Sequence, residues 1–403
     1  MSNLIGKVKS LSETYFEDIL NIRRHIHAHP ELSYEEYGTA RYIEKKLKEF
    51  GIASTKRIGQ TGITFIINGR ENGKTIALRA DIDALPILEQ NDVSYKSTNN
   101  GVMHACGHDV HTASLLGVVK ILSQLTDEFK GAVKFIFQPA EEKSPGGASI
   151  LIREGVLKNP TPSFILGQHV MPLIPEGKVG FRKGKYMASA DEIYLTVRGK
   201  GGHAAMPENF IDPIAIASQI LVALQQVVSR MANPKIPSVL SFGKIEGGNM
   251  NNVIPNEVRI DGTFRTFDEE WRKKALQKIK NIASSIASSL GGSCQIDIAP
   301  GYPFVINNEE YTERNIDAAK AYMGEENVLA LDLWMAAEDF AFYTHKVPGC
   351  FYRLGTRNEA LGITSGVHTP TFNIDENALK IGMGLMAFLA INELNSSHIK
   401  SII

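Results

Sequence analysis

A dense cluster of metal-binding residue types lies between positions 103 and 111, in the run Met103-His104-Ala105-Cys106-Gly107-His108-Asp109-Val110-His111. Cys106 and His108 are one residue apart just ahead of a predicted helix, and a thiolate and an imidazole are preferred ligands of borderline-soft divalent metals. For an isolated Cys-x-His pair, a structural cysteine among surface histidines is the ordinary alternative. Three histidines beside one of only three cysteines in the chain favour a metal site. Because this cluster cannot complete a site alone, further ligands are expected elsewhere.

Two adjacent carboxylates, Glu141 and Glu142, follow the apolar run 133–137, which is typical of a strand buried on both faces. The carboxyl ends of such strands are where open α/β folds place their ligand sites. One carboxylate could bind a metal while its neighbour stays free as a general base. A solvated acidic turn is the alternative, and the position after a buried strand favours the functional role.

Two more histidines stand at positions suited to metal binding. His169 follows the short apolar strand 164–166, and His368 lies in a loop ahead of the last predicted helix. Alone, the first would be a hydrogen-bonded core histidine and the second an unremarkable loop residue. With Cys106, His108 and Glu142 they make five candidate ligands. Five exceed the four of a closed structural zinc site and suit a two-metal hydrolytic centre.

Asp81 and Asp83 follow another buried strand, in the run Arg79-Ala80-Asp81-Ile82-Asp83-Ala84-Leu85-Pro86. In an extended segment both side chains face the same way. Orienting a histidine ligand by hydrogen bonding is the natural role for one of them, and we favour Asp83. A capping or turn aspartate is the alternative.

The elements that must position these residues alternate between helix and strand patterns in the N-terminal third. Ser33-Tyr34-Glu35-Glu36 has the pattern of a capping box that opens a helix ending at Gly51. The runs 63–67 and 75–78 predict strands, joined by a hairpin turn at Asn72-Gly73. Such alternation predicts a mostly parallel, mixed sheet flanked by helices, the α/β class.

The middle of the chain predicts a different unit. From about 184 to 299 the patterns run β-α-β-β-α-β, the split ferredoxin-like order, with Asp212 and Asp268 as helix N-caps. The α/β patterns then resume. We therefore predict a catalytic domain from residues 1–183 and 300–403, and an inserted ferredoxin-like lid domain from 184–299.

Composition excludes several classes of protein. The 403 residues include 43 basic and 44 acidic side chains, a formal charge of −1, which gives no electrostatic footprint for nucleic acid or an anionic membrane. Three cysteines exclude a disulfide framework, and no secretion signal is visible, so a cytoplasmic location is expected. The longest apolar run, 381–391, is well short of the ~20 residues that span a bilayer and predicts a buried helix.

The motifs together resemble a known family. Their order and length resemble the aminoacylase/carboxypeptidase group of co-catalytic metallopeptidases, and within it the amidohydrolases that include hippurate hydrolase, N-acyl-amino-acid hydrolases and plant auxin-conjugate hydrolases. The resemblance runs from about Arg23 to Leu394. It rests on the motifs RADIDALP at 79–86, MHACGHD at 103–109, QPAEE at 138–142, GQHV at 167–170, GKGGHAAMP at 199–207 and HTP at 368–370.

The resemblance implies roles for single residues. Glu141 would be the general base, and the metal ligands would be Cys106, His108, Glu142, His169 and His368. The inserted domain would be a lid and often a dimerisation surface. From it His203 would reach toward the scissile carbonyl, in its own or a partner's site. Asn252 and Arg265 would bind the substrate carboxylate; without the resemblance they are equally well a turn asparagine and an exposed strand arginine.

One departure from the family pattern narrows the branch. The peptidase branches have a His-x-Asp ligand motif where this chain has Asp81-Ile82-Asp83, so Asp81 is not expected to bind metal. Cys106 supplies a ligand instead, which favours the amidohydrolases over the peptidases.

The expected reaction is hydrolysis of an N-acyl-L-amino acid, such as an N-acetyl or N-benzoyl derivative, to a carboxylate and a free amino acid. It would use two divalent ions per subunit, Zn²⁺ or Mn²⁺, with Co²⁺ or Ni²⁺ also compatible with mixed N, O and S ligands. The partners expected are this small-molecule substrate and a second copy of the chain. The alternatives are a dipeptidase of the same superfamily, a hydrolase with Cys106 as nucleophile, and a catalytically silent metal-binding protein.

Overall fold

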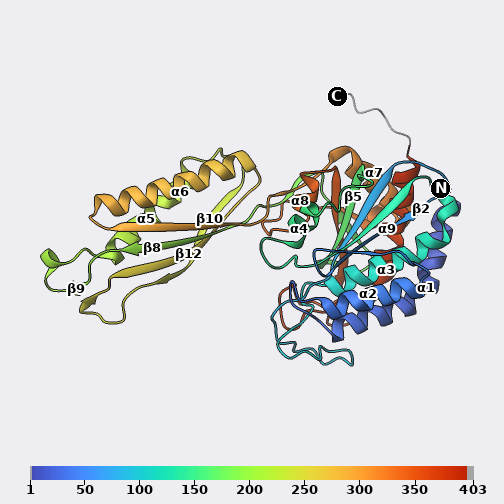
Figure 1. The fold of residues 1–403 in the computed structure, drawn as a ribbon, viewed down its shortest axis with the longest axis horizontal. Helices are drawn as coiled ribbons and strands as arrows, with labels where there is room; N and C mark the ends of the chain where they lie inside the picture. The colour runs from blue at the N-terminus through green and yellow to red at the C-terminus, as the bar shows by residue number, and fades with distance from the viewer. Residues whose placement is uncertain (1, 397–403) are drawn as a thin grey trace. The chain divides into compact units, whose positions relative to one another are not determined.

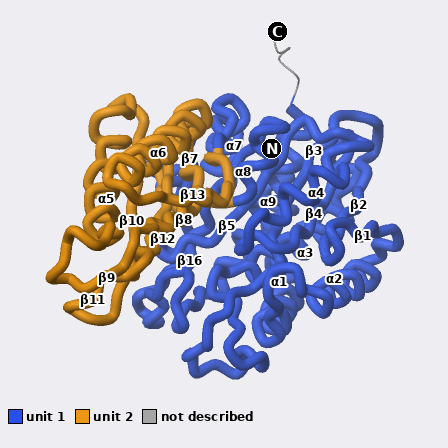
Figure 2. The backbone as a smooth tube through the Cα atoms, turned by 60° about the vertical axis from the view of Figure 1, so that its left-hand side comes forward, with its two compact units in different colours: residues 1–184, 306–332, 339–403 blue, residues 185–305, 333–338 orange. Residues whose placement is uncertain are grey.

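The computed structural model describes residues 2–396 and divides them into two compact units (Figure 2). The first comprises residues up to Gly184, Ile306–Asp332 and the residues from Asp339 on; the second comprises Lys185–Val305 and Leu333–Glu338. The insertion expected from sequence, 184–299, ends six residues earlier than this second unit and lacks its short return segment. That segment carries no helix or strand pattern, and it joins the unit through a bridge between Met187 and Trp334.

The first unit is built on an eight-stranded mixed sheet (Figure 1). Neighbouring strands β4, β3, β5 and β16 run parallel, and the other strands lie outside them. In spatial order the strands are β1 (Lys56–Ile58), β2 (Gly62–Asn68), β4 (Ala132–Gln138), β3 (Thr75–Asp81), β5 (Phe164–Pro175), β16 (Gly349–Arg357), β6 (Val179–Phe181) and β15 (Val328–Ala330). The short strands β7 (Gly184–Met187) and β14 (Val305–Asn307) lie where the chain passes between the units. The predicted α/β fold class is confirmed.

Helices flank this sheet. They are α1 (Ser2–Ala28), α2 (Tyr37–Glu49), α3 (His108–Gln124), α4 (Gly147–Arg153), α7 (Glu309–Met323), α8 (Ala341–Thr344) and α9 (Ala378–Asn395), with short 3-10 turns at Thr126–Glu128 and Glu325–Asn327. The apolar run 381–391 belongs to α9, which is almost entirely buried, as its composition predicted. Within residues 2–396 no helix has the length and apolarity to cross a bilayer.

The predicted hairpin at Asn72-Gly73 is wrong. Strand β4 lies between β2 and β3, antiparallel to the first and parallel to the second. The link between β2 and β3 instead bonds to the turn before β4: the N–H of Gly69 donates to the carbonyl of Gly131, and the N–H of Gly131 donates to that of Glu71. A turn sequence between two strands that follow one another in the chain cannot reveal that a later strand lies between them in the sheet.

The predicted capping box is also wrong. Helix α2 begins at Tyr37, so Glu36 is the residue that precedes it, and its side chain makes no cap hydrogen bond. The hydroxyl of Ser33 donates to Asp83, 50 residues further along the chain. Both side chains are used in long-range contacts that a local pattern does not encode.

The second unit is a four-stranded antiparallel sheet with two helices. Its strands lie in the order β10 (Ser238–Glu246), β12 (Glu257–Thr266), β8 (Asp191–Arg198) and β13 (Ser293–Pro300). Helices α5 (Pro213–Ser229) and α6 (Glu269–Ser289) share one apolar core with it, and a small ladder pairs β9 (Gly202–His203) with β11 (Val253–Ile254). The predicted N-caps are confirmed, since Asp212 accepts from the N–H of Ile214 and Asp268 from that of Trp271.

Candidate metal centre

Adjacent strands of the first unit carry several of the candidate site residues, at the level where β3 ends. Strand β3 ends at Asp81, and β4 leads into Glu141 and Glu142. His169 lies in the middle of β5, not after its end as predicted, because this strand continues to Pro175. Because these strands are parallel neighbours, residues as far apart in sequence as Asp81 and His169 come to one region of the sheet. The sequence therefore places these side chains by strand topology rather than by local motifs.

Helix α3 brings the Cys-x-His pair to the same region. His108 is its first residue, and Gly107 before it has a left-handed φ of 82°. A Cβ at Gly107 would lie 2.6 Å from Cγ2 of Val170, so only glycine allows this close approach to β5. This turn brings Cys106 and His108 close to His169 on β5.

The five predicted ligands converge. The Sγ atom of Cys106 lies 3.5 Å from Nε2 of His169 and 3.3 Å from Nε2 of His368. Oε1 of Glu142 lies 3.3 Å from Nε2 of His368 and 3.9 Å from Nε2 of His108. Cys106 thus belongs to two sets of ligand atoms, one with His108 and His169 and one with Glu142 and His368. Within each set, all the ligand atoms lie within 4.8 Å of one another.

Hydrogen bonds fix which ring nitrogen of each histidine faces this cluster. Nδ1 of His108 lies 2.9 Å from the carbonyl oxygen of Asp83 and 3.2 Å from its Oδ1, so Nδ1 carries the proton. Nδ1 of His169 donates to the carbonyl of Val170 at 2.7 Å. When they are neutral, both rings therefore present the Nε2 lone pair, as metal-binding histidines do.

The loop that carries His368 is held in an unusual backbone conformation. His368 has a left-handed φ of 61°, uncommon for a residue other than glycine, and its N–H donates to the carbonyl of Ala105 at 2.7 Å. That bond ties the loop to the residue before Cys106. Such outliers concentrate at functional sites.

The cluster is electrostatically suited to cations. Burial opposes the charge of His108, yet Asp81, Asp83 and Glu142 together raise its pKa to about 10. Burial, followed by Glu142 and Glu141, raises the pKa of the Cys106 thiol well above its usual range. Nearby carboxylates raise the pKa in both cases, whereas burial, the largest cause for Cys106, acts against the rise for His108.

The donor set fits divalent metal ions. Nε2 of His108 is buried and has no hydrogen-bond partner in the part of the chain that the structure describes. A buried lone pair without a partner is costly unless something binds it. A cysteine sulfur, two further imidazoles and a carboxylate lie near it, and such donors are ligands for zinc-like ions, so His108 and its neighbours are suited to hold two of them.

Asp81 and His111 also lie close enough to His108 to share a metal ion with it, but their side chains already form hydrogen bonds with other groups. Asp81 accepts from Nδ1 of His111 at 2.6 Å and from Nη1 of Arg79 at 2.5 Å. Nε2 of His111 accepts from the backbone N–H of Val170 at 2.9 Å. His111 thus holds the peptide that follows His169. Sequence reasoning missed this positioning contact, although His111 was visible in the cluster at 103–111.

The second unit carries the other predicted residues. His203 pairs with Val253 between β9 and β11, and the N–H of Ala204 donates to the carbonyl of Asn252 at 3.0 Å, so His203 and Asn252 are neighbours. Nδ1 of His203 accepts from the N–H of Ala205 at 3.1 Å. In its neutral form the exposed ring therefore carries its proton on Nε2 and can donate from it.

Arg265 lies on β12 and is half-buried. Its Nε donates to Thr263 at 3.1 Å, and burial lowers its pKa. Within residues 2–396 its guanidinium forms no ion pair, whereas Arg259 on the same strand pairs with Glu257 at 2.8 Å. A half-buried guanidinium without a carboxylate partner is suited to bind a carboxylate ligand.

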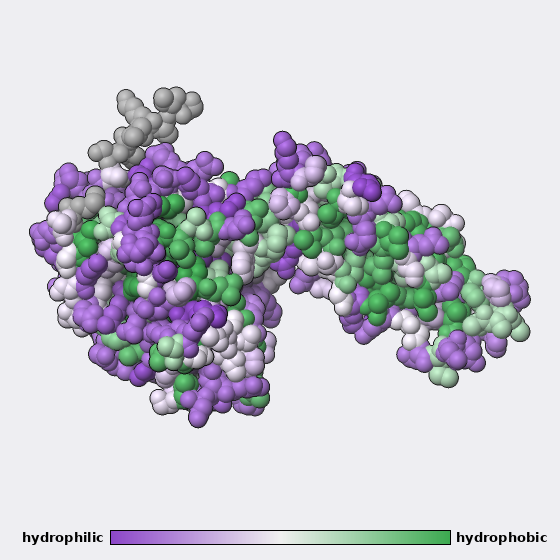
Figure 3. All heavy atoms as spheres, turned by 180° about the vertical axis from the view of Figure 1, so that it is seen from behind, coloured by the Kyte–Doolittle hydropathy of each residue, from purple (hydrophilic) through white to green (hydrophobic). Residues whose placement is uncertain are grey.

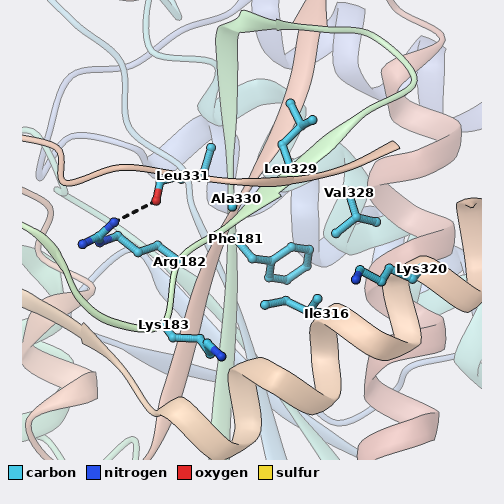
Figure 4. A pocket seen from close by; sticks show the side chains of 9 residues that line it. All are labelled: Phe181, Arg182, Lys183, Ile316, Lys320, Val328, Leu329, Ala330 and Leu331. Atoms are coloured by element: carbon cyan, nitrogen blue, oxygen red, sulfur yellow. Dashed lines mark hydrogen bonds between the residues drawn. The ribbon is translucent and has the colours of Figure 1, made fainter. Parts of the chain in front are cut away.

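A surface pocket of about 360 Å³ lies elsewhere in the first unit, between α7 and strands β6 and β15 (Figure 4). Three cationic side chains line it, and each is already engaged. Arg182 donates to the carbonyl of Leu331 at 2.9 Å, Lys183 pairs with Glu313, and Lys320 lies 3.1 Å from Glu325. We assign no function to this pocket.

Comparison with known proteins places the chain in a family. Residues 77–392 match Peptidase family M20/M25/M40. "Thermostable carboxypeptidase 2" of Saccharolobus solfataricus is 39% identical over 396 residues, covering 98% of this chain and 100% of that protein. "N-acetylcysteine deacetylase" of Bacillus subtilis is 41% identical over 375 residues, covering 93% of this chain and 96% of that protein.

A solved structure gives the same result. The Bacillus subtilis YXEP protein, described as a dinuclear metal binding peptidase from the M20 family, has a TM-score of 0.81 and 37% identity, covering 95% of this chain and 99% of that one. The resemblance expected from the motifs is confirmed. By sequence and by fold, this chain belongs to Peptidase family M20/M25/M40.

Proposed function

We propose that this protein hydrolyses the amide bond of N-acyl-L-amino acids, giving a carboxylate and a free amino acid, with two divalent cations per subunit. The observation that carries the proposal is the convergence of Cys106, His108, Glu142, His169 and His368, with the second carboxylate of Glu141 beside them. A deacetylase of an N-acyl amino acid among the relatives agrees with it.

The metal ligands would be those five residues, and Cys106 belongs to both sets of ligand atoms. Asp83 would orient His108 through the Nδ1 bond. Bound divalent cations would lower the pKa of a water molecule toward neutrality and polarise the amide carbonyl. Zn²⁺ or Mn²⁺ are the ions we propose, with Co²⁺ or Ni²⁺ as substitutes that the mixed ligand set also accepts.

Proton transfer would fall to Glu141. Its carboxylate is almost completely buried, and its Oε2 lies 4.0 Å from Nε2 of His108. Glu141 would take a proton from the attacking water and deliver it to the leaving amine. Nε2–H of His203 would donate to the oxyanion of the tetrahedral intermediate, a contribution worth about 3 kcal/mol where such donors have been removed.

Substrate binding would rest on the second unit. We propose that Arg265 and Asn252 bind the free carboxylate of the substrate. That role fits the guanidinium of Arg265, which lacks an ion pair. It would also favour acyl amino acids over simple amides.

We also propose that the protein forms a homodimer through the second unit, because that unit has an exposed apolar surface. Helix α5 contains no charged residue, and Val222 on it is 74% exposed. The neighbouring strand β10 is an open sheet edge with Ile245 53% exposed. Figure 3 shows hydrophobic residues gathered on this unit. An exposed apolar face beside an open edge suits pairing with a second copy, and His203 would then act in its own or in the partner's site.

Peptide hydrolysis is the second candidate, because a relative is named a carboxypeptidase. A C-terminal peptide residue and an acyl amino acid both place a free carboxylate next to the scissile amide.

A cysteine nucleophile is disfavoured, because such residues need a lowered thiol pKa, whereas burial raises the pKa of the Cys106 thiol. A cytoplasmic location is proposed because Cys106, Cys294 and Cys350 are all unpaired.

Metal analysis combined with a substrate panel tests the proposal. The panel contains N-acetyl and N-benzoyl amino acids, dipeptides and a neutral acyl amide. We expect two ions per subunit and turnover of the acyl amino acids; preferential turnover of dipeptides would favour the second candidate. Glu141→Gln should keep both ions and lose turnover. An active Glu141→Gln enzyme would show that the assigned base is wrong.

A further inference from the structure

The segment that was predicted to cap α2 instead holds the loop of the general base. Glu36 is completely buried, and its Oε1 accepts the backbone N–H of Ala140 at 2.8 Å, 104 residues away in sequence. Ser33 donates to Oδ2 of Asp83 at 2.6 Å, and the same oxygen accepts the backbone N–H of Glu142 at 3.0 Å. The N–H groups on either side of Glu141 are therefore both held by carboxylates that segment 33–36 supplies or supports.

The environment of Glu36 is unusual for a carboxylate without a local structural task. Oε1 also accepts the N–H of Tyr34 at 2.9 Å, and Oε2 accepts the hydroxyl of Thr61 at 2.7 Å. No lysine, arginine or histidine within residues 2–396 forms an ion pair with it. Burial, followed by the nearby charge of Asp83, raises its pKa to about 7. A buried carboxylate without a counter-ion is costly, which indicates a functional reason for keeping it.

Ala140, the residue that Glu36 holds, is in a conformation that alanine rarely adopts. Its φ is 51°, in the left-handed region, which costs a residue with a Cβ roughly 1–2 kcal/mol. Its carbonyl accepts the N–H of Gly147 at 2.8 Å, so both polar groups of the residue are fixed. Ala140 precedes Glu141 directly. Its backbone angles therefore set the direction in which the Glu141 side chain leaves the end of β4.

We propose that Glu36 is a positioning residue for Glu141, and that it acts by holding Ala140 in its left-handed conformation. The proposal rests on the proposed function, in which Glu141 is the general base. Without the carboxylate, the N–H of Ala140 would lose its partner and the residue would be free to leave the left-handed region. The carboxylate of Glu141 would then no longer be oriented toward the attacking water, while the metal ligands and the substrate-binding residues of the second unit would keep their positions.

The kinetic test compares two replacements of Glu36. Methionine fills a similar volume but cannot accept the bonds. Glutamine can accept both N–H groups on Oε1 and donate from Nε2 to Thr61. Glu36→Met should lower kcat roughly 10- to 100-fold, the size of effect that small misplacements of catalytic groups produce. KM and the content of two metal ions should not change. Glu36→Gln should restore kcat to within about threefold of wild type, because it restores the bonds.

Three further variants complete the series. Glu35→Gln changes the exposed neighbour and should leave kcat unchanged. Thr61→Val removes only the hydroxyl donor to Oε2. It should lower kcat in the same direction by a smaller factor, and it serves if Glu36→Met does not fold. Glu141→Gln in the same assays reports on the general base itself.

Amide hydrogen exchange supplies a readout that does not depend on turnover. In the metal-loaded enzyme the peptide covering Ala140 should exchange slowly. Exchange should become at least tenfold faster in Glu36→Met and return toward wild type in Glu36→Gln.

The outcomes distinguish failure of the positioning role of Glu36 from failure of the proposed function. If the wild-type enzyme turns over none of the N-acyl amino acids in the panel, the proposed function fails. If Glu141→Gln stays active, the assigned base is wrong and the positioning role falls with it. If Glu141→Gln is inactive while Glu36→Met, or Thr61→Val in its place, keeps wild-type kcat and slow exchange, only the positioning role is overturned. A fall in kcat accompanied by loss of metal or a raised KM would also overturn it, since the defect would then be general.

Discussion

Asp83 and His108 form a buried pair in which Nδ1 of the imidazole lies 3.2 Å from Oδ1 of the carboxylate. The bond sets the protonated nitrogen of His108 and turns Nε2 toward the ligand cluster. The other oxygen of Asp83 holds the backbone of Glu142. One side chain thus orients two predicted ligands at once.

Replacing Asp83 should therefore weaken metal binding. Asp83→Asn keeps the volume but removes the charge and one acceptor, and loss of such an outer partner typically lowers metal affinity about 10- to 100-fold. Competitive chelator titration measures it. Asp92→Asn, at an exposed position, is the control. Unchanged affinity in Asp83→Asn would show that the contact is structurally incidental.

Metal removal separates the proposed mechanism from a thiol mechanism. A chelator should abolish turnover, and added Zn²⁺ or Mn²⁺ should restore it. Cys106→Ser should lose the thiolate-to-cobalt charge-transfer band of the Co²⁺-substituted enzyme and bind metal more weakly. Cys294→Ser, in the second unit, should keep both properties. Activity that survives the chelator and is lost with iodoacetamide would favour a cysteine nucleophile instead.

Arg265 should act on substrate binding. Arg265→Ala should raise KM for N-acyl amino acids by at least tenfold, because a charge-assisted bond to the carboxylate is worth roughly 1.5–3 kcal/mol. A neutral acyl amide should be unaffected. Arg259→Ala removes an exposed arginine of the same strand that is already paired with Glu257, and it should change neither substrate. Equal effects of Arg265→Ala on both substrates would refute the carboxylate role.

The dimer proposal predicts that a charge on α5 blocks association. Val222→Asp should convert the protein to a monomer in light scattering, because a carboxylate would be buried without a partner in the interface. Ser218→Asp, on an exposed turn of the same helix, tests how far the interface extends. A dimer that persists in Val222→Asp would place the interface elsewhere.

Mixing two inactive variants tests whether His203 acts in the partner's site. Unfolded and refolded mixtures of Glu141→Gln and His203→Ala form mixed dimers. If His203 acts across the dimer, one site of each mixed dimer is complete, and about a quarter of wild-type activity should return. If it acts within its own subunit, no site is complete and none should return.

The sequence predicted the chemistry of the centre better than its geometry. Cys106, His108, Glu142, His169 and His368 could be predicted as ligands because metal-binding residue types cluster ahead of a helix or stand on and after buried strands, and parallel strands bring such strand positions together. Ser33 and Glu36 were misinterpreted because their spacing also matches a helix cap. Their partners, Asp83 and Ala140, lie 50 and 104 residues away, and no local pattern records such contacts.

The same limit explains the wrong hairpin. Asn72-Gly73 is a good turn sequence, but β4 lies between the two strands that it would join and is buried along its whole length. Tertiary burial overrode the local turn signal. His111 was missed as a positioning residue for a related reason. It accepts the backbone N–H of Val170, and a contact to a backbone group leaves no pattern in the sequence.

The buried carboxylate of Glu36 predicts a pH dependence of stability. Its pKa is about 7 in the folded protein and 4.5 in the unfolded chain, so between these values the folded state holds a proton that the unfolded state has lost. The free energy of unfolding should therefore fall as pH rises from 4.5 through 7, by about 3 kcal/mol from this group. Glu36→Gln cannot titrate and should lack that slope. Urea unfolding of the metal-free proteins at pH 5 and pH 8 measures it, and the variant should gain stability relative to wild type at the higher pH. Equal pH slopes in the two proteins would show that Glu36 is already ionised at pH 5.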